Sequence, residues 1–179
     1  MKELYTKRLI VRNFTPDDAK DLQEIIISKE ASKYAIYDHE FPTALTEVRE
    51  INRRFSMEDK FLAVWEPIDR KVIGFVCLNG DPEKMLDLGF CFNASYQGKG
   101  YAIEAASAVI DYAFNTLQVK RLESGTANLN EPARRLLEKL NFSKMNEEIL
   151  SFRTTPDGKP IEFVGSNYLL EKDEWQKRK

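Results

Sequence analysis

The chain of 179 residues is 42% hydrophobic and 31% charged, values typical of a soluble globular protein rather than of a disordered or membrane protein. This length allows one domain with a sizeable core and is too short for two ordinary domains without a visible linker. The net charge of −2 argues against a general nucleic-acid binder, because such a protein needs a basic surface.

Cysteine and histidine usage bears on metal binding and on the cellular compartment. Cys77 and Cys91 both fall in hydrophobic strand-like runs without a Cys-x-x-Cys spacing, and His39 is the only histidine. The sequence therefore predicts no metal site and two reduced core thiols, as in a cytoplasmic protein. The N-terminus lacks the apolar core of a signal peptide, and no run approaches the ~18 apolar residues of a membrane span, so no membrane partner is expected.

The first half of the chain is expected to alternate between strands and helices. Residues 8–14 predict a strand, and Thr15 followed by Pro16 marks the start of a helix that runs to about Ser28. Residues 29–42 have no clear period and are interpreted as a loop, whose carboxylates could hold a cationic amine or simply face water. The other elements expected here are a helix at 45–57, strands at 61–66 and 72–78 joined by a turn at 67–71, and a turn at 79–82.

A central strand is predicted from Met85 onward by strict alternation. Leu86, Leu88, Phe90 and Phe92 alternate with Asp87, Gly89 and Cys91, which is the period of a strand with two unlike faces. Glycine inside a strand often marks a bulge or a close approach of a ligand, so Gly89 predicts a bulge that leaves main-chain amides unpaired.

A glycine-containing turn, Gly98-Lys99-Gly100, leads from this strand into a long helix. Such a turn presents unpaired N–H groups and the positive end of the helix dipole, which suits phosphate oxygens, and Lys99 adds a positive charge. Two nucleotide-binding loops fit badly, because the turn lacks the Gly-Lys-Ser/Thr ending of a P-loop and the third glycine of a Rossmann turn. The helix is apolar on two sides, and a narrow polar stripe is expected to be its only face to water: Glu104, Ser107, Asp111 and Asn115.

The remaining segments complete a single mixed domain without repeats or linkers. A strand is expected at 121–127, and Asn130 with Pro132 predicts the start of a helix at 133–140. Strands at 150–154 and 161–170 are expected to flank the turn 155–159, followed by a polar tail at 171–179.

Three stretches resemble the GNAT acetyltransferases. Gln97-Gly98-Lys99-Gly100-Tyr101-Ala102 resembles the Q/R-x-x-G-x-G/A pyrophosphate loop of that family, and Asn130-x-x-Ala133 followed by Glu138-Lys139-Leu140-x-Phe142 resembles its second cofactor segment. The extension to Glu104-Ala105, together with Thr6-x-Arg8-Leu9-x-x-Arg12 and Pro16-x-Asp18-Ala19, is similar to the branch of ribosomal-protein N-terminal acetyltransferases, the RimJ/RimL-like enzymes.

The resemblance implies a fold, an activity and a set of site residues. The fold would be α/β (α+β), with a mixed, mostly antiparallel sheet of about six to seven strands that splays after the central strand, and about four helices on its two faces. The activity would be transfer of an acetyl group from acetyl-CoA to a primary amine by direct attack in a ternary complex, in a monomer or a homodimer. The residues implied to bind acetyl-CoA are Phe90, Cys91, Phe92, Gln97, Gly98, Lys99, Gly100, Tyr101, Ala102 and Asn130.

The proton-transfer groups are less well defined. Asp87 stands where this branch often has a glutamate and is the candidate catalytic base. An alternative is that Asp87 is simply a solvent-facing strand residue. The competitors for the role of base are Glu104, Glu147, Glu148 and Glu162. Ala133 and Leu137 stand where the family often has a serine and a tyrosine. Either the thiolate leaves unprotonated, or Tyr96, Tyr101 or Tyr168 donates a proton, or the chain is a non-catalytic acyl-CoA-binding or sensing module. Asn141 replaces the usual glycine before Phe142, so a different turn is expected after that helix.

Overall fold

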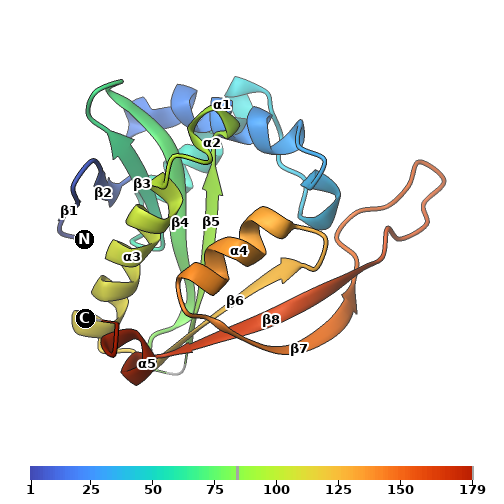
Figure 1. Ribbon diagram of the computed structural model, residues 1–179. Helices are drawn as coiled ribbons and strands as arrows, with labels where there is room; N and C mark the ends of the chain where they lie inside the picture. Colours follow the sequence, from blue (N-terminus) through green and yellow to red (C-terminus); the bar gives the residue numbers. More distant parts are fainter. Residues whose placement is uncertain (84, 179) are drawn as a thin grey trace.

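The strands form one open sheet in the order β1-β2-β3-β4-β5-β6-β8-β7 (Figure 1). The structure is a computed structural model that describes residues 1–83 and 85–178. Every neighbouring pair of strands in this range is antiparallel except β5 and β6, which run parallel. The strands are β1 (Leu4–Tyr5), β2 (Ile10–Asn13), β3 (Phe61–Glu66), β4 (Lys71–Asp81), β5 (Met85–Phe92), β6 (Arg121–Ala127), β7 (Ser143–Leu150) and β8 (Phe163–Glu171).

Helices cover both faces of the sheet (Figure 1). Leu22 of α1 (Ala19–Glu30) and Val48 of α2 (Leu45–Ser56) pack with Phe75 of β4 on one face. Ala106 of α3 (Tyr101–Asn115) and Leu137 of α4 (Glu131–Lys139) belong to the larger cluster on the other face. The alanines of α3 leave little side-chain bulk between its backbone and the sheet, which allows the two to approach closely.

The mixed, mostly antiparallel fold with helices on both faces is therefore confirmed. The sheet has eight strands rather than six or seven, and the described residues form five α-helices rather than four. The additional elements are short: the two-residue strand β1 and the five-residue helix α5 (Lys172–Gln176).

The predicted bulge at Gly89 is wrong. The register between β4 and β5 runs without a shift from Gly74↔Phe92 to Asp81↔Met85. A Cβ built on Gly89 would lie 2.6 Å from Sγ of Cys77, the residue directly opposite on β4. Glycine is present here because the Cys77 side chain occupies the space above it, not because the strand changes its pairing.

The closing hairpin also differs from the prediction. The strand before β8 is Ser143–Leu150, whereas the expected strand at 150–154 contributes only an isolated bridge between Thr154 and Pro160. β7 lies at the edge of the sheet, is exposed over almost its whole length, and shifts register between Lys144 and Asn146. Such a strand carries no alternation of buried and exposed residues from which it could be recognised.

The expected polar tail contains a buried tryptophan instead. Trp175 of α5 is only 5% exposed, and its Nε1–H donates to Asp111 of α3 at 2.8 Å. Glu104 on the same stripe of α3 is likewise covered, by Thr6 and Arg8, so the stripe is not simply a face to water. Within the described ranges, no helix is long and apolar enough to cross a membrane.

Candidate functional site

The parallel strands β5 and β6 separate soon after they meet, as Figure 1 shows. Only two residue pairs join them, Leu86↔Leu122 and Asp87↔Glu123. Just beyond these pairs the hydroxyl of Ser124 donates to the carbonyl of Leu88 at 2.7 Å, so a side chain takes the place of the next main-chain contact. The predicted splay after the central strand is therefore present, and it leaves one edge of β5 without a strand partner from Leu88 onward.

The main-chain groups of β5 that face this divergence are those of the even-numbered residues. The Leu88 carbonyl points to β6, where Ser124 reaches it, whereas the Asn93 amide points the other way and donates to Ile73 of β4. Because successive residues of a strand direct their polar groups to opposite edges, the N–H groups of Phe90 and Phe92 face the divergence and that of Cys91 faces β4. Of the three residues predicted on this strand, two can therefore offer an amide to a ligand between β5 and β6.

The glycine turn presents further N–H groups beside the end of β5. Gly98 (φ +74°) and Gly100 (φ +82°) both adopt the left-handed conformation that favours glycine. No side chain caps the N-terminus of α3, so the amides of its first turn face outward at the positive end of the helix dipole. Gln97 connects this turn to the strand, because its Nε2 donates to the Phe92 carbonyl at 2.9 Å. This arrangement suits an anionic group such as a phosphate.

Arg8, from the loop between β1 and β2, holds the turn in place. Its guanidinium donates from one nitrogen to the Lys99 carbonyl at 2.9 Å, pairs with Glu104 at 2.7 Å, and lies 4.4 Å from the ring centre of Tyr101. Burial alone would raise the pKa of Glu104, but hydrogen bonds from Thr6 and Arg8 outweigh burial and leave that pKa below its ordinary value. The Thr6-x-Arg8 pattern indicates a family resemblance but does not predict this contact between Arg8 and the glycine turn.

Asp87 lies at the closed end of the divergence, in the last β5·β6 pair. Its side chain is half-buried and points to the α1/α2 face, opposite to that of Leu88. Burial, and secondarily the charge of Glu123, raise the pKa of Asp87 to about 6. Two competing carboxylates instead have a lowered pKa: Glu104, as described, and exposed Glu147, through hydrogen bonds from Lys144 and Asn128. Of these three carboxyls, Asp87 is thus the one whose pKa is raised toward neutral pH.

A family model described as an acetyltransferase (GNAT) domain matches residues 8–143, a span that includes β5, the glycine turn and α4. The chain belongs to the GNAT acetyltransferases.

Individual GNAT relatives agree with this assignment. The chain is 30% identical over 155 residues to an uncharacterised N-acetyltransferase, p20, of Bacillus licheniformis, across 80% of this chain and 84% of that protein. A GNAT-family acetyltransferase structure from Bacillus anthracis superposes with a TM-score of 0.82 at 22% identity, covering 97% of this chain and 100% of that one. A ribosomal-protein-S5-alanine acetyltransferase from Vibrio fischeri has a TM-score of 0.77 at 18% identity, covering 98% and 99%. At these identities the two structures establish the shared fold alone.

The second predicted cofactor segment of this GNAT chain is a capped helix. The Asn130 side chain accepts a hydrogen bond from the Ala133 amide at 3.3 Å, as an N-cap does. Whether Asn130 also faces coenzyme A stays a prediction. After α4, Asn141 takes a left-handed φ of +64°, and Phe142 N–H donates to the Leu137 carbonyl. Asn141 thus adopts the left-handed conformation that glycine commonly supplies at a helix C-terminus, and whether the turn differs from that of relatives stays a prediction.

The proton donors common in other GNAT enzymes are absent at positions 133 and 137. Leu137 is fully buried in the hydrophobic core, where packing requires no hydroxyl group. Of the tyrosines proposed as substitutes, Tyr96 donates its hydroxyl to Asp69 at 2.7 Å, and that bond raises its pKa to about 12. Tyr168 is 3% exposed within the core cluster, and Tyr101 lies under Arg8.

Two surface hollows, of about 420 and 430 Å³, lie away from these residues. One is beside the C-terminal end of α3, at Leu117 and Arg121, and the other is against its outer side, at Tyr5 and Tyr112. Neither includes β5 or the glycine turn. The candidate site is accordingly defined by main-chain groups at the separation of β5 and β6, not by a hollow in the surface.

The left-handed conformation of Gly98 provides a test of the turn. A Cβ at Gly98 would meet no atom within 4 Å, so replacement costs only backbone conformation. We expect Gly98→Ala to lower the free energy of unfolding by about 1–2 kcal/mol, and Gly98→Asn to lower it by less, since asparagine tolerates this region better. Urea unfolding measures both variants. Equal losses for the two variants would contradict a purely conformational cost.

Proposed function

We propose that this chain transfers an acetyl group from acetyl-CoA to a primary amine, by direct attack of the amine within a ternary complex. One observation carries the proposal: the free edge of β5 and the uncapped N-terminus of α3 adjoin, linked by the Gln97–Phe92 hydrogen bond. Together they offer main-chain donors to an extended acyl group and to a phosphate at its end, which is the shape of an acyl-coenzyme A.

The residues of both elements fit such a ligand. The amides from Gly98 to Ala102 would receive the diphosphate, assisted by Lys99, and Asn130 would face the coenzyme from the other side of the divergence. Phe90 and Phe92 would donate their N–H groups to the acyl-bearing arm. Acetyl-CoA supplies the activated acetyl group, and no covalent enzyme intermediate is required. Holding donor and acceptor in one geometry contributes up to about 7–11 kcal/mol in favourable cases.

Two groups of the chain are assigned chemical roles. An N–H of β5, from Phe90 or Phe92, stabilises the oxyanion that develops at the attacked carbonyl, an effect of about 10²–10³ in rate. Asp87 accepts the proton of the attacking amine, directly or through water, because its raised pKa leaves it ionised at neutral pH and still basic enough to act.

The acceptor is proposed to be the N-terminal amine of a protein. Support comes from the RimJ/RimL-like motif around Thr6 and Arg8 and from the shared fold with the Vibrio fischeri ribosomal-protein-S5-alanine acetyltransferase. A small-molecule amine is the other possibility within the same reaction. The localisation that fits these acceptors is cytoplasmic, where both they and acetyl-CoA are present.

A second function is a non-catalytic acyl-CoA-binding or sensing module. The specific observation that favours it is the absence of a hydroxyl at both Ala133 and Leu137, which leaves the departing thiolate without a dedicated donor.

Binding and turnover separate the two functions. Acetyl-CoA at about 100 times its Kd should raise the Tm by roughly 5–10 °C, the shift expected for about 2.7 kcal/mol of binding linkage in a domain of this size. Free thiol should then appear only when an amine is added, from a panel of N-terminal peptides, polyamines and small amines. Stabilisation without thiol release for any amine would favour the binding module. Stabilisation by ATP or NAD and not by coenzyme A would contradict both.

The pH dependence tests Asp87. A base must be ionised, so kcat/KM should rise with pH through an inflection near 6, and Asp87→Asn should remove that inflection and lower kcat by about 10²–10⁴. The stability effect has the opposite sign: a carboxyl whose pKa is raised from 3.8 to about 6 stabilises the folded state less as pH rises across that interval. The variant should therefore be at least as stable as the wild type at pH 7, and an unchanged pH profile would refute the role.

The contact of Arg8 with the glycine turn tests the diphosphate site. Arg8→Ala should weaken binding of coenzyme A about tenfold, because the Lys99 carbonyl and Glu104 lose a charged partner. Arg8→Lys should bind with intermediate affinity, since lysine cannot form the same fork. Calorimetric titration measures the Kd, and exposed Lys7→Ala serves as the charge-matched control. A loss of the same size for Lys7→Ala would attribute the effect to net charge.

A further inference from the structure

The two halves of the sheet contact each other again at the open end of the divergence. The C-terminal end of α1 lies beside the end of β5, because the Ser28 hydroxyl accepts a hydrogen bond from the Ala94 amide at 2.9 Å. The segment after α1, residues 31–44, then reaches the start of β8, where the ring centres of Tyr37 and Phe163 are 5.2 Å apart. Since β8 pairs with β6, this segment connects the ends of the two strands that separate.

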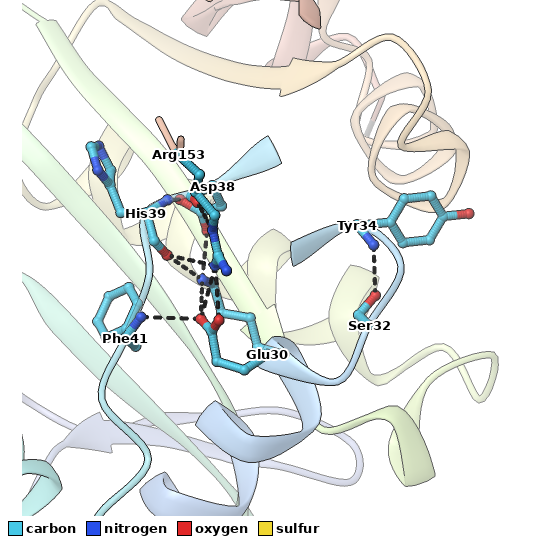
Figure 2. A network of polar contacts seen from close by, with 8 residues as sticks. Glu30, Ser32, Tyr34, Asp38, His39, Phe41 and Arg153 are labelled. Atoms are coloured by element: carbon cyan, nitrogen blue, oxygen red, sulfur yellow. Dashed lines mark hydrogen bonds and ion pairs between the residues drawn. The ribbon is translucent and has the colours of Figure 1, made fainter. Parts of the chain in front are cut away.

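Arg153, in the loop between β7 and β8, supplies the polar part of this connection. Its guanidinium pairs with the Glu30 carboxylate at 2.8 Å, and it donates to the main-chain carbonyls of Asp38 at 2.7 Å and His39 at 3.3 Å (Figure 2). Glu30 also accepts from the Phe41 amide, and Lys29 donates to the His39 carbonyl at 2.7 Å. These five residues and Lys29 form what we call the Arg153 network: Lys29, Glu30, Asp38, His39, Phe41 and Arg153.

The network is largely withdrawn from solvent. The side chains of Arg153 and Glu30 are 17% and 14% exposed. Burial would raise the pKa of Glu30, but hydrogen bonds from Arg153, Lys29 and the Phe41 amide outweigh it and leave the pKa below its ordinary value of 4.5. The carboxylate is consequently charged at neutral pH. This partly buried ion pair is costly to break from one side, because Arg153 also donates to two main-chain carbonyls, of which only that of His39 has a second donor, Lys29.

A second cation of the same loop shows the contrast. Lys159 pairs at 3.0 Å with Asp157, two residues away, and both side chains are mostly exposed. That pair lies within one turn, whereas Glu30 and Arg153 are 123 residues apart in the chain. Arg153 thus links segments that belong to the two halves of the sheet, and the Lys159 ion pair does not.

We propose that Arg153 is a positioning residue that joins residues 31–44 to the β7–β8 loop and so fixes how these two segments lie at the open end of the divergence. The aromatic contacts of Tyr37 with Phe163 and of His39 with Phe152 form beside the network and depend on the same loop placement. Because Asp87, Cys91 and the segment 31–44 lie on one face of the sheet, this placement also determines how an acceptor reaches the site. The effect on acceptor access rests on the proposed function, whereas the placement of the two segments is independent of it.

Hydrogen exchange on the free protein tests the placement without any ligand. In Arg153→Ala and in the nearly isosteric Glu30→Gln, amides of residues 31–44 and 151–162 should exchange about tenfold faster, while those of β3 and β4 stay unchanged. Arg153→Lys should recover part of the protection, and Lys159→Ala should match the wild type. Unchanged exchange in both segments, or an equal rise throughout the sheet, would overturn the proposal.

Kinetics with the most reactive amine of the panel tests the consequence for the acceptor. Arg153→Ala should raise the KM for that amine about tenfold while the Kd of coenzyme A, measured by calorimetry, stays within about twofold, because the glycine turn is not part of the network. An equal rise in the KM for the amine and in the Kd of coenzyme A would overturn the positioning role. If the wild type binds no coenzyme A, the proposed function fails, and the exchange result still decides whether Arg153 joins the two loops.

Discussion

Two residue pairs join β5 to β6, and the chemistry available to the molecule depends on the loss of pairing beyond them. A main-chain N–H or carbonyl that leaves water without a partner is costly, so the free edge of a strand needs side chains, water or a ligand. Ser124 and Gln97 satisfy the carbonyls of Leu88 and Phe92, which leaves mainly N–H groups facing the divergence. The opposite edge of β5 is paired with β4 along its full length, so these donors are held on a rigid strand. The site therefore favours a ligand rich in acceptors.

Such a divergence is stable only if its two sides are held by contacts other than a continuous ladder. The hydrophobic cluster beneath α3 and α4 spans both halves of the sheet, from Leu88 of β5 to Leu122 of β6 and Leu170 of β8. Two arginines complete it with directional contacts, Arg8 at the glycine turn and Arg153 at the open end. Each satisfies a main-chain carbonyl and a carboxylate together, which a planar fork can do and a lysine cannot do equally well. Both arginines lie far in sequence from their partners.

That distance explains which features could be predicted from the sequence. Local patterns predicted β3 at Phe61–Glu66, the alternation of β5, and the glycine-containing turn before α3. The bulge at Gly89 was wrong because the cause of that glycine is Cys77, a cross-strand neighbour that no local pattern reveals. β7 was missed because an exposed edge strand has no buried face. The contact that covers Glu104 with Arg8 was missed because 96 residues separate the two in the sequence. The roles of Asp87, Asn130 and the loop amides toward a ligand stay predictions.

The absent hydroxyls at Ala133 and Leu137 bear on how the proposed reaction would end. Burial raises the pKa of the Cys91 thiol, which packs on the α1/α2 face of β5, to about 12. An ordinary thiol has a pKa near 8.5, so a coenzyme thiolate released at neutral pH would take up a proton. Asp87, once it has taken the proton of the amine, is a carboxylic acid whose pKa of about 6 lies below that of an ordinary thiol near 8.5. Return of that proton to the sulfur is therefore downhill. Under the proposed mechanism one carboxyl would act first as base and then as acid, and neither hydroxyl would be needed.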